Sequence, residues 1–66
     1  MINELYSYDK YKGFDIYIED KPRFFYGNIY FNGTRMYGDI KAMSPEKCLA
    51  RCEDKVDAVI AKEQGE

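Results

Sequence analysis

The dipeptide Asn32-Gly33 separates two runs of alternating apolar and polar residues, and it limits the possible folds of this chain more than any other feature. A type I′ hairpin turn needs φ > 0 at both central positions, and Asn followed by Gly adopts that conformation readily. We therefore predict a β-hairpin over residues 24–43. Counted outward from the turn, its apolar face pairs Phe31 with Thr34, Ile29 with Met36, Gly27 with Gly38, and Phe25 with Ile40.

The opposite face of this hairpin is aromatic and partly charged. Its predicted cross-strand pairs are Tyr30 with Arg35, Asn28 with Tyr37, Tyr26 with Asp39, and Phe24 with Lys41. Aromatic residues favour strands, and ring contacts between strands stabilise a sheet, so the pattern alone does not require a binding partner. Tyr and Arg are also enriched in protein interfaces, which makes this face a candidate binding surface.

A strand before the hairpin is predicted from the alternation of residues 13–19, whose apolar side chains are Phe14, Ile16 and Ile18. A period of two is typical of a half-buried strand. Pro22 has no N–H for a strand ladder, so we predict a turn with Lys21-Pro22 at its tip. The resulting pairs are Ile18 with Phe25, Ile16 with Gly27, Phe14 with Ile29, and Tyr17 with Tyr26 on the aromatic face.

A helix is predicted to follow the hairpin over residues 44–62, with a polar tail at 63–66. Ser44 is a good N-cap, and Pro45 suits the first helical position. Six apolar residues fall within an arc of about 120° on the helix; they are Cys48, Leu49, Cys52, Val56, Val59 and Ile60. The gap that Gly27 and Gly38 leave in the apolar face of the sheet indicates a close approach of this helix.

The predicted fold class is therefore α+β, in one domain spanning residues 1–66. A three-stranded antiparallel β-meander (13–43) carries one C-terminal α-helix packed on one face, giving the order β-β-β-α. Residues 1–12 contain several Tyr without a clear period, and we interpret them as an N-terminal arm. The alternatives are a short edge strand or a segment that becomes ordered on a partner. Because a core of this size is small, we also expect a homodimer.

The composition excludes several kinds of chemistry. The chain has no His, so no imidazole base, Ser-His-Asp triad or His-ligated metal is possible. Its five Gly residues are scattered and form no phosphate-binding loop. We predict a protein that is not an enzyme and needs no cofactor. Cys48 and Cys52 are expected as core thiols; the alternative, a Cys₄ zinc site across a dimer, would require them to leave the sheet-facing side of the helix.

The expected location is the cytoplasm, without a membrane partner. No run approaches the roughly 18 apolar residues of a membrane span, and the first residues lack the basic and apolar regions of a signal peptide. Two cysteines four residues apart in a helix do not resemble a secreted disulfide framework, which favours a reducing compartment.

The candidate binding site combines the aromatic sheet face with a basic row on the helix. Its residues are Tyr17, Phe24, Tyr26, Tyr30, Arg35, Tyr37, Lys41, Lys47, Arg51 and Lys55. Three interpretations remain open: a solvated face that binds nothing, a protein-docking face, or a face whose rings stack on unpaired bases of single-stranded RNA or DNA. The net charge of −2 favours the protein over the nucleic acid.

The chain resembles the partner-binding half of HicB-type antitoxins over about residues 11–62. The matching positions are Tyr11–Ile16 at the opening of a strand, Gly38-Asp39 late in the hairpin, and Ser44–Leu49 at the opening of the helix. Asn32-Gly33 stands where that family usually has a Pro-Gly-Cys turn. The resemblance implies a non-catalytic domain that often dimerises and acts by occupying a partner's surface. Short, Tyr-rich, acidic chains also look like phage-encoded inhibitors of host proteins, so a small bacterial or phage-type inhibitor or regulator is expected.

Overall fold

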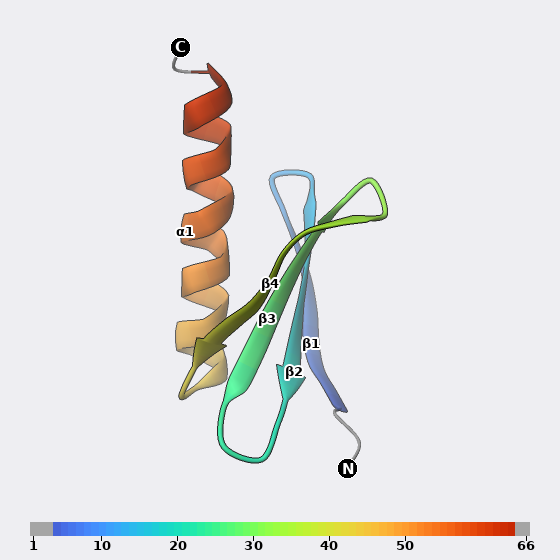
Figure 1. Cartoon of the computed structure of the whole chain (residues 1–66), viewed down its shortest axis with the longest axis vertical. Helices are drawn as coiled ribbons and strands as arrows, with labels where there is room; N and C mark the ends of the chain where they lie inside the picture. The colour runs from blue at the N-terminus through green and yellow to red at the C-terminus, as the bar shows by residue number, and fades with distance from the viewer. Residues whose placement is uncertain (1–3, 65–66) are drawn as a thin grey trace.

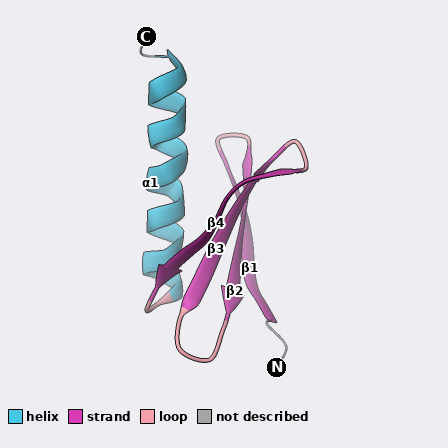
Figure 2. Ribbon diagram, in the orientation of Figure 1, coloured by secondary structure: helices cyan, strands magenta, loops and turns pink. Residues whose placement is uncertain are grey.

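A computed structural model describes residues 4–64 of the protein (Figure 1). Its elements are β1 (Glu4–Tyr11), β2 (Phe14–Asp20), β3 (Phe25–Phe31), β4 (Thr34–Ala42) and α1 (Pro45–Gln64). The strands form one antiparallel sheet in the order β1-β2-β3-β4. The helix α1 packs on one face of this sheet, and among residues 4–64 no element covers the second face, which we call the open face (Figure 2).

The prediction of a three-stranded sheet is wrong, because β1 adds a fourth strand where an arm was expected. A two-residue turn at Lys12-Gly13 joins β1 to β2, with φ of 51° and 87°. This is the backbone conformation that Asn32-Gly33 adopts, with φ of 56° and 81°, as predicted for the β3–β4 turn. Lys rarely takes a positive φ, so the first turn carries a much weaker sequence signal. Residues 1–3 of the expected arm and 65–66 of the expected tail lie outside the described residues.

The register between β2 and β3 differs from the prediction by two residues. Ile16 lies opposite Ile29, and Ile18 lies opposite Gly27. The loop is longer than predicted and is closed by a hydrogen bond that the backbone N–H of Lys21 donates to the carbonyl oxygen of Phe24 (3.0 Å). Side chains alternate with a period of two, so an even shift changes the pairs but keeps each residue on its predicted face.

The register between β3 and β4 is predicted correctly only beside the turn. The observed pairs include Phe31 with Thr34 and Tyr30 with Arg35, but then Ile29 with Tyr37, Gly27 with Ile40, Tyr26 with Lys41, and Phe25 with Ala42. Two irregularities in the ladder separate these groups, and each adds one residue to β4. The irregularity nearer the turn shifts the register by one residue. Because side chains alternate between the two faces, this shift moves Tyr37 from the open face to the helix side of the sheet. Asp39, with φ of 58°, lies in the irregular stretch.

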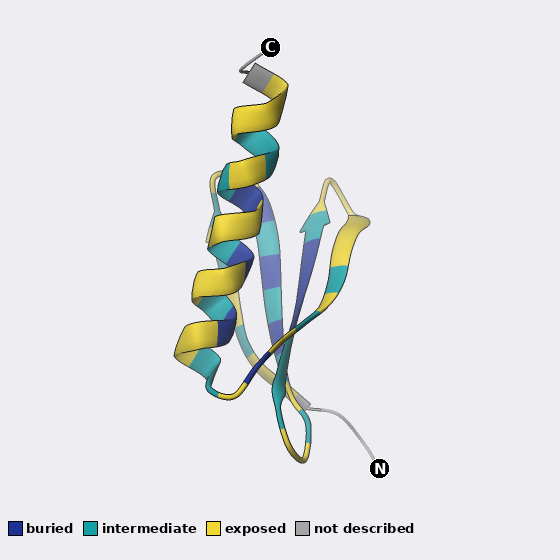
Figure 3. Cartoon of the chain, turned by 60° about the vertical axis from the view of Figure 1, so that its left-hand side comes forward, coloured by how far each residue is buried: buried dark blue, intermediate teal, exposed yellow. Residues whose placement is uncertain are grey.

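The core lies between α1 and the sheet (Figure 3). Its buried apolar residues are Phe14, Ile16, Ile18, Ile29, Ala42, Cys48, Cys52 and Val56. A Cβ placed on Gly27 would clash with Sγ of Cys52 and lie 3.3 Å from Sγ of Cys48, so the predicted close approach of the helix is confirmed there. At Gly38 the interpretation is wrong, because the space above it is filled by the guanidinium of Arg35.

The ends of α1 are held by polar contacts. Oγ of Ser44 accepts a hydrogen bond from the backbone N–H of Lys47 (3.2 Å), which confirms the predicted N-cap. In the C-terminal half of α1, Oδ1 of Asp57 accepts a hydrogen bond from Nζ of Lys12 (2.8 Å). The hydroxyl of Tyr11 donates to the same carboxylate and lies 3.1 Å from each of its two oxygens. The Lys12 contact lowers the pKa of Asp57. These contacts therefore connect α1 to the β1–β2 turn, which was not predicted from the sequence.

Candidate functional site

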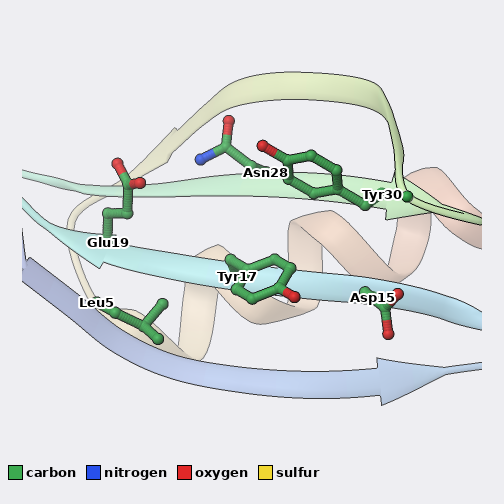
Figure 4. Close-up of a pocket in the computed structure, with 7 residues that line it drawn as sticks. Leu5, Asp15, Tyr17, Glu19, Asn28 and Tyr30 are labelled. Atoms are coloured by element: carbon green, nitrogen blue, oxygen red, sulfur yellow. The ribbon is translucent and has the colours of Figure 1, made fainter.

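The open face contains a hollow of about 420 Å³, which is the candidate site (Figure 4). It is lined by Leu5, Asp15, Tyr17, Glu19, Asn28, Tyr30 and Gly33. The alternation of β2 places its three lining residues on one face. The β2–β3 register then sets Asn28 opposite Tyr17 and Tyr30 opposite Asp15. The hollow is thus built from adjacent positions on rigid strands, together with Leu5 on β1 and Gly33 in the hairpin turn.

A row of three tyrosine rings crosses the open face from β1 to β3. The ring centroids of Tyr8 and Tyr17 are 5.0 Å apart, and those of Tyr17 and Tyr30 are 5.4 Å apart in an edge-to-face arrangement. Such contacts order the rings beyond the effect of burial alone. Tyr8 nevertheless remains 49% exposed. The row therefore presents apolar surface together with hydroxyl groups to the surroundings.

Two carboxylates flank Tyr17 in the hollow. Oδ1 of Asp15 accepts a hydrogen bond from the hydroxyl of Tyr8 (2.7 Å), and Nζ of Lys10 lies 3.7 Å from the same oxygen. The hydrogen bond to this carboxylate is the main cause of a raised pKa for Tyr8. Glu19 forms no ion pair or side-chain hydrogen bond with any residue in the described range 4–64. The centre of the open face is therefore acidic as well as aromatic.

Basic side chains stand around this centre. Nζ of Lys21 lies 4.2 Å from the ring centroid of Tyr26, and Nζ of Lys41 lies 4.5 Å from that of Phe24. Both pairs are cation–π contacts near the β2–β3 loop. At the other end of the hairpin, Nη2 of Arg35 lies 3.7 Å from Oδ2 of Asp39. Arg35 lies opposite Tyr30, as predicted, but within the described part of the chain the two side chains form no cation–π contact.

Four of the ten predicted site residues belong to a separate surface along the helix. Tyr37 faces the helix side, where Nζ of Lys55 lies 5.2 Å from its ring centroid. Nη1 of Arg51 donates a hydrogen bond to the carbonyl oxygen of Lys41 (2.6 Å), so its role is to join α1 to β4. Lys47 is exposed in the first turn of α1. The predicted site therefore combined two separate surfaces. The three basic residues of the helix belong to α1, which packs on the other side of the sheet, and only Tyr37 is displaced by a β4 irregularity.

Apart from Gly33 of the predicted turn, five residues at or beside the hollow were not predicted as site residues: Leu5, Tyr8, Asp15, Glu19 and Asn28. Leu5 and Tyr8 belong to β1, which was interpreted as an arm. The signal for the two carboxylates was present, because they alternate with Tyr17 on the predicted aromatic face. They were treated only as ordinary polar residues of a half-exposed strand.

The two cysteines are core residues, as predicted. Sγ of Cys48 donates a hydrogen bond to the carbonyl oxygen of Ile40 (3.2 Å). Burial raises the pKa of the Cys52 thiol to about 12, so the group stays protonated. Within residues 4–64 no cluster of three or more His, Cys, Asp or Glu side chains has an arrangement that could hold a metal ion.

Comparisons with protein-family models, with curated proteins and with solved structures find no match to this chain. The resemblance to HicB-type antitoxins therefore stays a prediction. In the described part of the chain, no helix combines the length and the apolar character needed to cross a membrane.

Proposed function

We propose that this protein is a non-enzymatic binding module whose open face docks on another protein and thereby occludes that partner's surface. The observation that carries the proposal is the tyrosine row on the open face, next to a hollow that none of the described residues fills. Tyr is among the residues most enriched in protein interfaces, since it offers a large contact area and a polar tip. Small bacterial or phage-type inhibitors that act by occlusion would use a surface of this kind.

The charges on the open face favour a protein over the alternative partner, a single-stranded nucleic acid. Asp15 and Glu19 lie on either side of Tyr17. Bases stacked on that ring would bring their phosphates close to two carboxylates, and like charges repel at such distances. Lys21 and Lys41, which would have to neutralise the phosphates, lie instead at the β2–β3 end of the face.

The proposal includes self-association and a cytoplasmic location. A 66-residue chain buries a small core, and association with a second copy would add to the buried apolar surface. Cys48 and Cys52 are free thiols, which is typical of proteins from reducing compartments.

The test is affinity capture from the cells that produce the protein, using the tagged full chain. Replacing both Tyr17 and Tyr30 by Ala should weaken binding of the partner by about thirtyfold or more, because truncating central interface aromatics costs about 1–2 kcal/mol or more each. Tyr37→Ala is the matched control, since that ring is also partly exposed but faces the helix side. Thermal melting of each variant checks that its fold is intact.

Nuclease treatment of the lysate separates the two classes of partner. Capture that survives the nuclease and depends on the open-face tyrosines supports the proposal. Capture that is lost on nuclease treatment would assign the face to nucleic acid. Equal capture by the Tyr17/Tyr30 variant, the Tyr37 variant and the unchanged chain would remove the open face from consideration.

A further inference from the structure

We infer that the hollow on the open face binds a basic, extended segment of the partner protein, with one arginine side chain beside Asp15 and a second beside Glu19. This inference rests on the proposed function, and it adds the chemistry of the partner. The lining of the hollow includes two carboxylates, two tyrosine rings and one amide, and no described residue adds a cationic side chain to it (Figure 4).

Both carboxylates have unused capacity to accept hydrogen bonds. On Asp15 the contacts from Tyr8 and Lys10 both go to Oδ1, so within the described residues Oδ2 has no donor. The Lys10 contact is long and its side chain is 64% exposed, so it competes weakly with an incoming cation. Glu19 has no ion-pair partner among residues 4–64, even though Lys21 and Lys41 are held near the same end of the face by aromatic rings.

Asn28 provides an observation that is independent of the acidic groups. It lines the hollow and is only 9% exposed, yet its amide makes no hydrogen bond with another described residue. No side-chain polar atom in the described range is both sealed from solvent and without a partner, so this amide opens into the hollow. Its oxygen can accept a hydrogen bond from a guanidinium or from the backbone N–H of a bound segment.

The rings favour arginine over lysine. Tyr17 and Tyr30 present faces and edges within the same hollow. A guanidinium is planar, stacks on aromatic rings and donates paired hydrogen bonds to a carboxylate, while an ammonium group is a compact and strongly hydrated charge. An arginine side chain beside Asp15 can therefore use the carboxylate and the ring of Tyr30 at the same time.

The spacing of the carboxylates sets the spacing of the arginines. Asp15 and Glu19 are four residues apart on one strand, so their Cα atoms are separated by roughly 13 Å. An extended segment of the partner has the same rise per residue. Arginines at positions i and i+4 of that segment therefore reach both carboxylates, and the side chain at i+2 lies over Tyr17.

The test is an NMR titration of the isotope-labelled full chain with three peptides. The probe is acetyl-Arg-Ser-Ala-Ser-Arg-amide. One comparison peptide carries citrulline, a neutral isostere, at both arginine positions, and the other has the same composition with its two arginines adjacent. We expect the probe to shift the backbone signals of Tyr17, Glu19 and Asn28. Its affinity should be about tenfold above that of the citrulline peptide and about threefold above that of the adjacent-arginine peptide.

Two variants assign the effect to the hollow. Glu19→Gln should weaken binding of the probe about threefold, whereas Asp54→Asn, an exposed helix position with the same change in net charge, should not alter it. Equal affinity for the citrulline peptide, shifts confined to other surfaces, or no shift at millimolar probe would overturn the inference. Equal affinity for the adjacent-arginine peptide would overturn the assignment of one arginine to each carboxylate.

The affinity capture described above keeps the two proposals distinguishable. A captured protein that depends on Tyr17 and Tyr30, but binds equally well to the Glu19→Gln chain, would leave the docking function intact and end the inference about its basic segment. A second copy of the chain as the captured protein would overturn the inference, because the arginines of this chain, Arg23, Arg35 and Arg51, are never four residues apart.

Discussion

Replacing Gly27 by alanine is expected to lower the free energy of unfolding by about 3 kcal/mol, at the upper end of the usual cost of overpacking a core. The added Cβ would collide with Sγ of Cys52 and crowd Sγ of Cys48, both of which are fully buried. The backbone conformation of Gly27 is not left-handed, so the effect is one of space alone. Urea unfolding measures the loss, and Gly27→Val should prevent folding, since small domains have little stability to lose.

A double-mutant cycle tests whether the collision with Cys52 causes the loss of stability expected for Gly27→Ala. Cys52→Ala alone should cost about 1 kcal/mol through the cavity it leaves. In the Gly27→Ala background the same change removes the colliding sulfur, so it should recover part of the lost stability. Cys48→Ala is the matched comparison, because its sulfur lies at 3.3 Å from the added atom and is only crowded. Additive effects of Gly27→Ala and Cys52→Ala would mean that the helix does not pack on the sheet at this point.

The thiol of Cys52 is expected to resist alkylation in the folded protein by about a thousandfold relative to the unfolded chain, because the thiolate is the reactive species. Burial raises its pKa from 9.0 to about 12, which lowers the thiolate fraction at neutral pH by that factor. Mass spectrometry after timed iodoacetamide treatment measures the rate, with the chain in urea as the reference. Fast labelling of Cys52 in the native protein would contradict the burial of this side chain between α1 and the sheet.

The same pKa difference predicts how stability depends on pH. The folded-state pKa of Cys52 is raised, so folding favours the protonated thiol. This contribution is fully present below the unfolded value of 9.0 and is lost as the pH rises from there toward about 12. Urea unfolding at alkaline pH should show a smaller loss in the Cys52→Ala variant than in the unchanged chain.

Much of the fold could be predicted from local signals. Asn32-Gly33 specifies its turn almost alone, Ser44-Pro45 specifies the helix start, and the spacing of the apolar residues on α1 identifies its buried side. Each of these signals depends on the conformational preference of one or two residues. The placement of Gly27 beneath the helix followed because a missing side chain in an apolar face needs something to fill the space.

The remaining differences come from features that local preference does not encode. The Lys12-Gly13 turn places a Lys at positive φ, which tertiary packing supports through the contact between Lys12 and Asp57. The two irregularities in β4 change the register without a Pro or an obvious bulge motif, so counting outward from the turn fails after the second pair. One odd shift was enough to move Tyr37 to the wrong face in the predicted site.

The candidate site could be predicted only in part, because local preferences do not encode how the strands pair. The aromatic character of the open face was evident, because the face assignment of β2 and β3 tolerates an even register error. The acidic centre required knowing that Asp15 and Glu19 frame a hollow, and the tyrosine row required knowing that β1 pairs beside β2. Only the assembled sheet brings these groups together.

In-cell photo-crosslinking tests most directly whether the open face is the binding surface. A benzophenone amino acid is incorporated at Tyr30, in the hollow, and separately at Ala58, an exposed position on α1. The account predicts a covalent adduct with a protein from Tyr30 and none from Ala58. The same adduct from both positions, or an adduct from Ala58 alone, would contradict the assignment of binding to the open face.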